Sequence, residues 1–273
     1  MQLAPIPALL LGAVLVFCSW MLVQRVLRPR LSRIPEPPPF PYQYAHLMAG
    51  VALYFGISLL IGGLLFEYYG GGERAKLEDM PPLVPLVATA ITQALVVFGI
   101  LYFLQRLRAL PGHLGLADPS PVNSLVRGLA MYACCLPGLF GSLLIWQVLL
   151  EGLGYPVAQQ DVAKQIESVQ GAGRIVAFIL AGAVIPFLEE LLFRGFIQNW
   201  LVRLRGFVPG LVGTSLLFAA LHGVTPFGYL IVVALAAGLA LQWTGSLWAA
   251  VGVHAANNAI NVLLLYFVSS QIP

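Results

Sequence analysis

Charged residues are scarce in this chain of 273 residues: Asp, Glu, Lys and Arg make up only 9% of it, while 59% is hydrophobic. A soluble domain carries roughly 25% charged residues, so the composition excludes a water-facing shell over most of the chain. The apolar residues occur in long unbroken runs and not in alternation, which indicates membrane-spanning helices and not a transmembrane barrel. The net charge of +3 gives no sign of nucleic-acid binding. The sequence therefore predicts an integral membrane protein.

Cysteine is also rare, and the cysteines present do not suggest redox or metal chemistry. Cys18, Cys134 and Cys135 lie in apolar runs without the spacing of metal ligands. Neighbouring residues on a helix point about 100° apart, so a disulfide between Cys134 and Cys135 is not expected, and all three are interpreted as packing residues. The N-terminal segment lacks the basic start and the cleavage site of a signal peptide. It is therefore interpreted as a retained first span.

Stretches long enough to cross a bilayer recur along the whole chain. A spanning helix needs about 20 mainly apolar residues, and eight candidate stretches approach or exceed this length. The predicted fold is an all-α, polytopic transmembrane helix bundle of about eight spans, the sixth and seventh of which are short. The predicted spans are 5–24, 45–66, 82–104, 128–150, 173–200, 206–224, 226–244 and 247–268.

The loops between the predicted spans differ in charge. In an eight-span arrangement the arginine-rich loops fall on one side of the membrane and most acidic residues on the other. The positive-inside rule then places the arginine-rich loops in the cytoplasm and both termini outside. Residues 151–172 contain the one clearly water-soluble amphipathic helix, which either lies on the membrane surface or caps a site. The residues that set this orientation are Arg25, Arg28, Arg30, Arg33, Arg106, Arg108, Arg127, Arg203 and Arg205 on one side, and Glu67, Glu73, Glu78, Asp79 and Glu151 on the other.

Three charges stand within six residues of the fifth predicted span, at Glu189, Glu190 and Arg194. Glu190 and Arg194 are four residues apart, so they share a helix face and can pair, whereas Glu189 points about 100° away. A charge in mid-membrane costs about 2.5–3.5 kcal/mol on insertion scales, which favours a water-accessible cavity lined by protein. Pro186 removes a backbone hydrogen bond and is expected to kink the helix toward that cavity. The alternative is a structural ion pair, with Glu189 packed against a polar neighbour.

Two histidines lie in residues 206–273, a stretch without Asp, Glu, Lys or Arg. Phe218 and His222 share a helix face, and so do His254 and Asn258. A carboxylate and a histidine can hold a water and take its proton, while a second histidine and a carboxamide can donate hydrogen bonds to a developing oxyanion. The alternatives are a histidine that only packs in the core or at the interface, and asparagines that link helices by hydrogen bonds.

The motifs of the standard hydrolases are missing. No G-x-S-x-G elbow is present, and no Asp lies within a predicted span to orient a base for Ser215. The H-E-x-x-H pairing of many zinc proteases is missing too. Metal-free activation of water is therefore favoured and no cofactor is expected, although a zinc site formed by Glu189, His222 and His254 is chemically possible.

Taken together, the motifs E-E-x-x-x-R, F-x-x-x-H and H-x-x-x-N resemble those of the CAAX prenyl protease and bacteriocin-processing (abortive infection) family, in order and in helical placement. The resemblance covers about 173–268. The chain is accordingly divided into N-terminal transmembrane helices and loops over 1–172 and a catalytic helical core over 173–268. The resemblance implies an intramembrane endopeptidase of the glutamate type with a conical intramembrane catalytic cavity. The motif residues are Glu189, Glu190, Arg194, Phe218, His222, His254 and Asn258.

The resemblance also implies a role for each motif residue. Glu189 would be the general base and would act on the water with His222, while His254 and Asn258 would form the oxyanion site. Glu190 and Arg194 would be a supporting ion pair. Packing and helix orientation are assigned to Phe218 and Pro186.

The expected partners are the lipid bilayer and a protein or peptide substrate, without nucleic acid. Prenylated tails, bacteriocin leaders and the membrane-anchored tails of exported proteins are all candidate substrates, and the expected location is a bacterial inner membrane. The alternative function is a non-catalytic transporter or scaffold that uses Glu189, His222 and His254 as a proton relay. A transporter fold is expected to contain two related halves, and the sequence shows none.

Overall fold

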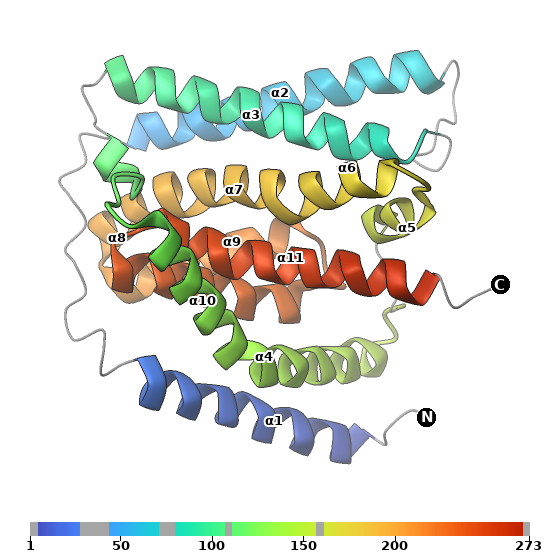
Figure 1. Ribbon diagram of the computed structural model, residues 1–273, viewed down its shortest axis with the longest axis vertical. Coiled ribbons are helices and arrows are strands. Elements are labelled where there is room, and N and C mark those ends of the chain that lie inside the picture. The colour runs from blue at the N-terminus through green and yellow to red at the C-terminus, as the bar shows by residue number, and fades with distance from the viewer. Residues whose placement is uncertain (1–4, 28–43, 71–79, 107–110, 157–160, 270–273) are drawn as a thin grey trace. The chain divides into compact units, whose positions relative to one another are not determined.

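The computed structural model describes residues 5–27, 44–70, 80–106, 111–156 and 161–269, and every regular element in these ranges is a helix (Figure 1). Seven of the described helices are long and apolar enough to cross a membrane. Helices satisfy all of their backbone hydrogen bonds internally, as a chain in lipid requires. The prediction of an all-α, polytopic membrane protein is confirmed.

The helices follow the apolar runs of the sequence. The N-terminal helices are α1 (Pro5–Leu22), with a final π turn η1 (Val23–Leu27), α2 (Tyr44–Gly70), α3 (Leu83–Arg106), the short η4 (Pro111–Leu114), α4 (Pro121–Gly152) and α5 (Asp161–Ser168). The fifth long span runs without interruption through α6 (Gly173–Ile179), η5 (Leu180–Val184), α7 (Ile185–Glu190), η6 (Leu191–Gln198) and α8 (Asn199–Arg205). The last three helices are α9 (Phe207–Leu221), α10 (Phe227–Thr244) and α11 (Leu247–Ser269).

Two of the predicted spans have wrong boundaries. The stretch 206–224 forms only the 15-residue helix α9, about 22 Å long at 1.5 Å per residue and shorter than a hydrocarbon core of about 30 Å. Helix α4 begins at Pro121, two turns before the predicted start at residue 128, because proline is well suited to the first turn of a helix. Seven described helices, not eight, therefore reach spanning length.

The fifth span is not a uniform α-helix. The π-helical turns η5 and η6 lie on either side of α7, the short segment that carries Glu189 and Glu190. Pro186 lies in the first turn of α7, directly after η5. Turns of this kind occur often at functional sites and bend the helices that contain them. The π turn η5 is therefore a second cause of bending next to Pro186, where the sequence predicts a kink.

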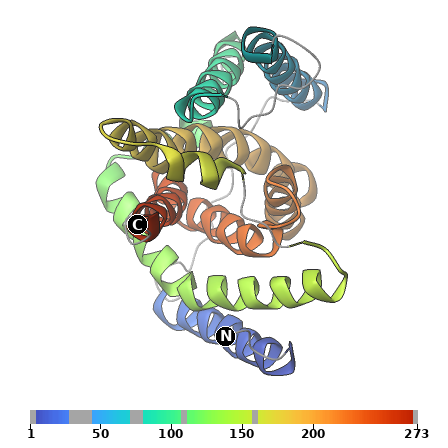
Figure 2. The same cartoon turned by 90° about the vertical axis from the view of Figure 1, so that its right-hand side faces the viewer.

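The described residues form two compact units, and each is treated by itself. Unit 1 lies within Met1–Pro38, Pro111–Ala158 and Phe193–Ala256, and unit 2 within Pro39–Leu110, Gln159–Leu192 and Asn257–Pro273. In unit 1, α1 and α10 both pack on α4, while α8 and α10 pack on α9 (Figure 1). In unit 2, α2 packs along α3 (Figure 2), and α3 also contacts α5, α6, η5 and α7. The division of the chain at residues 172 and 173 stays a prediction.

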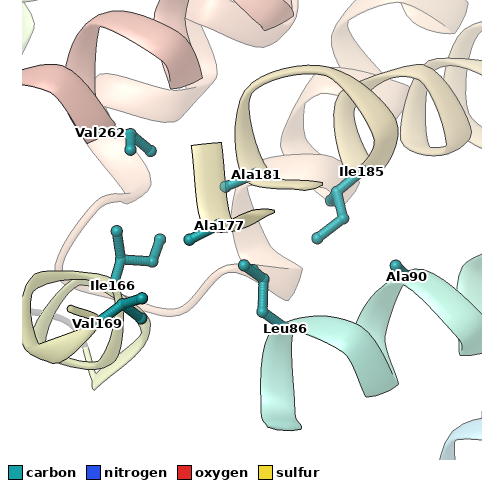
Figure 3. Close-up of a cluster of buried hydrophobic side chains, with 8 residues drawn as sticks. All are labelled: Leu86, Ala90, Ile166, Val169, Ala177, Ala181, Ile185 and Val262. Atoms are coloured by element: carbon teal, nitrogen blue, oxygen red, sulfur yellow. The ribbon is translucent and has the colours of Figure 1, made fainter. Parts of the chain in front are cut away.

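The predicted amphipathic helix is found as α5 in unit 2. Its apolar side joins a buried cluster with residues of α3, of the fifth span and of α11 (Figure 3). Lys164 and Asp161, on its exposed side, form an ion pair at 3.1 Å between Nζ and Oδ1. Burial of the apolar side therefore ties α5 to the helices around it. The cluster consists of Leu86, Ala90, Ile166, Val169, Ala177, Ala181, Ile185 and Val262.

The orientation of the protein in the membrane stays a prediction. Several of the charges on which it rests lie outside the described residues. They are Arg28, Arg30, Arg33, Arg108, Glu73, Glu78 and Asp79. Arg127, which was assigned to a loop, lies in the first two turns of α4 instead.

The connection between η4 and α4 is fixed to the start of α11 within unit 1. The hydroxyl group of Ser246 donates a hydrogen bond to Oδ2 of Asp118 at 2.5 Å, and the backbone N–H of Leu247 donates to the carbonyl oxygen of Gly115 at 2.8 Å. Gly115 has a φ of 74°, which favours glycine, and a Cβ there would lie 2.9 Å from the backbone nitrogen of Leu247. The loop thus sets where α11 begins.

This loop makes part of the stability depend on pH. Partial burial raises the pKa of Asp118, but hydrogen bonds from Ser124, Ser246 and the Ser120 backbone, with the charge of Arg127, outweigh burial and lower it overall. A carboxyl group with a lowered pKa stabilises the fold above its ordinary pKa of about 3.9, and this contribution is lost as the pH falls through the lowered value. Screening of this half-buried group keeps the contribution to about 1 kcal/mol or less.

We therefore expect Asp118→Asn to lower the melting temperature of the detergent-purified protein at pH 7 by a few degrees. The difference from the wild type should shrink as the pH is lowered toward 3. Thermal unfolding measured at several pH values checks this. A difference that stays constant from pH 7 to pH 3 would contradict the assigned role of the carboxylate.

Candidate functional site

Phe218 is the centre of a buried cluster within unit 1. The centroid of its ring lies 4.4 Å from that of His222 and 5.4 Å from that of His254, which meets it nearly edge-on. The guanidinium carbon of Arg194 lies 4.6 Å from the centroid of the same ring, in the geometry of a cation–π contact. The phenylalanine of the F-x-x-x-H motif thus brings together motif residues from three helical segments of unit 1.

His222 is oriented by the end of its own helix. Its Nδ1 lies 2.7 Å from the carbonyl oxygen of Phe218. Since a carbonyl oxygen only accepts hydrogen bonds, Nδ1 carries the proton in this contact, and Nε2 is the acceptor nitrogen of the neutral ring. The chain then turns at Gly223, whose φ of 92° favours glycine. The helix end therefore selects the tautomer that a proton-accepting role requires.

The loop after His222 is held by Trp146 of α4. The indole Nε1 donates a hydrogen bond to the carbonyl oxygen of Val224 at 2.8 Å, and the indole ring lies 5.3 Å from the ring of Phe227. Gly228 leaves room for this indole, because a Cβ at that position would lie 2.5 Å from Trp146 side-chain atoms. These contacts fix the segment that follows the candidate catalytic histidine.

The helix segment that carries Arg194 is docked on α10 by a repeated contact. Nη2 of Arg194 donates to the carbonyl oxygen of Ala234 at 3.0 Å, and one turn further along Nε2 of Gln198 donates to that of Gly238, also at 3.0 Å. The sequence suggested only Glu190 as a partner of Arg194, and that ion pair stays a prediction. The contacts with α10 and with Phe218 were not predicted.

Glu189 is buried in unit 2, and the structure supplies a partner that the sequence analysis missed. The amide Nε2 of Gln93 on α3 donates a hydrogen bond to Oε1 of Glu189 at 2.7 Å. Gln93 is itself buried. A carboxamide halfway along an apolar span was a detectable signal, because such groups are costly in lipid and are usually retained for function.

Asn258 links two helices of unit 2. Its Nδ2 donates to the carbonyl oxygen of Ala181 in η5 at 3.0 Å, and its Oδ1 accepts a hydrogen bond from Asn257 at 3.1 Å. This contact favours the alternative that asparagines join helices. The amide carries a second N–H, so a role at an oxyanion stays a prediction.

The structure thus divides the predicted site residues between the two units. Unit 1 contains Arg194, Phe218, His222 and His254, while unit 2 contains Pro186, Glu189, Glu190 and Asn258. Neither unit, over its described residues, holds a group of three His, Cys, Asp or Glu side chains able to bind a metal ion.

Comparison with known proteins finds a family match in the segment that carries the three motifs. Residues 171–260 match the family described as Type II CAAX prenyl endopeptidase Rce1-like. This range includes all three motifs, so the resemblance inferred from them is confirmed. The family is one of membrane proteases, which agrees with the prediction of a membrane-embedded peptidase. No curated protein and no solved structure matches the chain.

Proposed function

Because residues 171–260 of this multi-pass membrane protein match the CAAX prenyl endopeptidase family, we propose that it is an intramembrane endopeptidase that activates water with a glutamate and a histidine. The observation that carries this proposal is the cluster in which His222, His254 and Arg194 surround the ring of Phe218. The cluster unites residues of all three family motifs around one buried ring. Ordinary packing does not require two histidines and an arginine around one ring in a lipid-embedded bundle.

In the proposed reaction Glu189 is the general base. It takes one proton from a water molecule while the water oxygen bonds to the carbonyl carbon of the scissile peptide. Nε2 of His222, the acceptor in the tautomer described above, accepts the second hydrogen bond of that water. The carbonyl π electrons move onto oxygen, where His254 and Asn258 donate hydrogen bonds to the oxyanion. The C–N bond then breaks as Glu189 returns its proton to the leaving amine.

The substrate is a peptide bond of a membrane-associated or exported protein. The description of the matching family favours a lipid-modified, membrane-anchored tail, whereas a bacteriocin leader and an unmodified sorting tail use the same chemistry. A bacterial inner membrane is the proposed location of this multi-pass protein.

The test compares terminal peptides from the membranes of cells with the wild-type protein and cells with Glu189→Gln at equal protein levels. Proteolysis predicts new C-terminal and N-terminal peptides in the wild type that are missing from the variant. The non-catalytic alternative, in which Glu189, His222 and His254 relay protons in a transporter or scaffold, predicts identical peptide sets. Identical sets would therefore overturn the proposal.

A zinc-dependent, metalloendopeptidase-like version of this enzyme makes a different prediction. Metal-free activation of water predicts that cleavage by the purified protein is unchanged after dialysis against a chelator. Activity that is lost in the chelator and restored by zinc would instead assign Glu189, His222 and His254 as ligands. Zinc measured in the purified protein, with a parallel measurement on Glu189→Gln, separates a bound metal from a contaminant.

A further inference from the structure

Gln93 is a polar side chain in hydrogen-bond contact with Glu189 within unit 2. It lies halfway along α3, is only 6% exposed, and donates from Nε2 to Oε1 of the carboxylate at 2.7 Å. Its own Oε1 is buried and has no hydrogen-bond partner among the described residues. One end of the carboxamide is therefore committed to the glutamate and the other end is available.

The orientation of this carboxamide follows from the chemistry of its partner. An ionised carboxylate only accepts hydrogen bonds, so Nε2 has to face it and Oε1 has to point away. A buried acceptor left without a donor costs about 1–3 kcal/mol. Hydrophobic residues at positions 93 and 189 would fill the same space without leaving a buried acceptor unpaired. A purely structural contact therefore does not explain the glutamine.

We propose that Gln93 is a positioning residue for the general base, an inference that rests on the proposed proteolytic function. Its Nε2 holds the Glu189 carboxylate in one orientation, the one from which the carboxylate takes a proton from the catalytic water. The carboxamide thereby restricts the base of the proton transfer before the peptide arrives. Pre-orientation of this kind lowers the barrier of the chemical step more than it improves substrate binding.

The first test is Gln93→Leu in the purified enzyme with a cleavable peptide. Loss of the carboxamide is expected to lower kcat by about 10–100-fold and to leave KM within about threefold of the wild type, because the interaction acts on the base and not on the peptide. Thr92→Val on the same helix is the matched control. Thr92 is similarly buried but points about 100° away from Gln93, so its kcat is expected to stay at the wild-type value.

The second test is Gln93→Glu, which makes the donor depend on pH. Two carboxyl groups at hydrogen-bond distance do not both ionise readily, so one retains a proton and can donate to Glu189 as the amide does. The ratio of variant to wild-type kcat is therefore expected to rise about tenfold as the pH is lowered from 9 to 6. Tyr54, which interacts electrostatically with Glu189, and the adjacent Glu190 are present in both proteins, so their contributions largely cancel in the ratio.

Three results would overturn the inference while leaving the proposed function intact. They are an unchanged kcat in Gln93→Leu, an equal loss in Thr92→Val, and a ratio for Gln93→Glu that does not change with pH, as a purely structural contact predicts. Failure of the proposed function has a different signature, because either the wild type would then not cleave the peptide or Glu189→Gln would still cleave it. Melting temperatures of all variants identify any that do not fold. If Gln93→Leu does not fold, the pH dependence of the kcat ratio of folded Gln93→Glu to the wild type decides whether the inference holds.

Discussion

Glu189→Gln is expected to lower kcat/KM for peptide cleavage by about 10²–10⁴-fold, the contribution of a positioned general base. The amide has nearly the shape of the carboxylate but cannot take a proton from water. Gln93 can still donate to the new side chain through Nε2, since the amide oxygen at position 189 accepts a hydrogen bond as the carboxylate does. The fold is therefore expected to survive, with a melting temperature within a few degrees of the wild type.

Glu190→Gln is the matched comparison for this experiment. Glu190 is the next residue and is fully buried, so both variants remove one carboxylate from the same helix segment. In its predicted role as the partner of Arg194, Glu190 supports the structure, and its replacement is expected to lower the melting temperature more and kcat/KM less. The reverse pattern would make Glu190 the base. A purified Glu189→Gln protein that cleaves at the wild-type rate would remove Glu189 from the mechanism.

The motif residues could be predicted from the sequence because their spacing has a physical meaning. Phe218 and His222 were placed on one helix face by their spacing of four, and the structure brings their rings to 4.4 Å. The same reasoning could not show that Phe218 also contacts His254 and Arg194. Those contacts depend on how separate helices pack, and a periodicity within one helix contains no information about that.

Gln93 was missed for a related reason. A single amide in an apolar span has no spacing relation to anything, so the sequence indicates that it needs a partner but not which one. The π turns η5 and η6 were also missed, because segments of five to eight residues are too short to distinguish a π from an α periodicity. The membrane helices themselves were predictable, since a run of about 20 apolar residues has few other solutions in a bilayer.

Gly252→Ala is expected to destabilise unit 1 and to lower activity strongly. A Cβ at Gly252 would lie 2.5 Å from the carbonyl oxygen of Leu125 and 3.2 Å from the Cα of Gly128, so α4 and α11 cross there backbone to backbone. Small residues permit such crossings in membrane helices. Backbone atoms cannot turn aside as a side chain can, and overpacking typically costs 1–3 kcal/mol, occasionally more.

In Gly252→Ala, the loss of activity is expected to be larger than the loss of stability alone would cause. His254 follows Gly252 by two residues, so a shift of α11 moves its ring away from Phe218, and a displacement of about 1 Å can cost roughly 100-fold in rate. Gly62→Ala on α2 is the control, because a Cβ there meets nothing within 4 Å, and it is expected to be neutral or stabilising by about 0.5–1 kcal/mol. Melting temperatures measure the loss of stability. Values of kcat/KM, measured well below the melting temperatures of both variants, measure the loss of activity separately. Equal melting temperatures and equal kcat/KM for Gly252→Ala and Gly62→Ala would show that the close crossing of α4 and α11 does not set the position of His254.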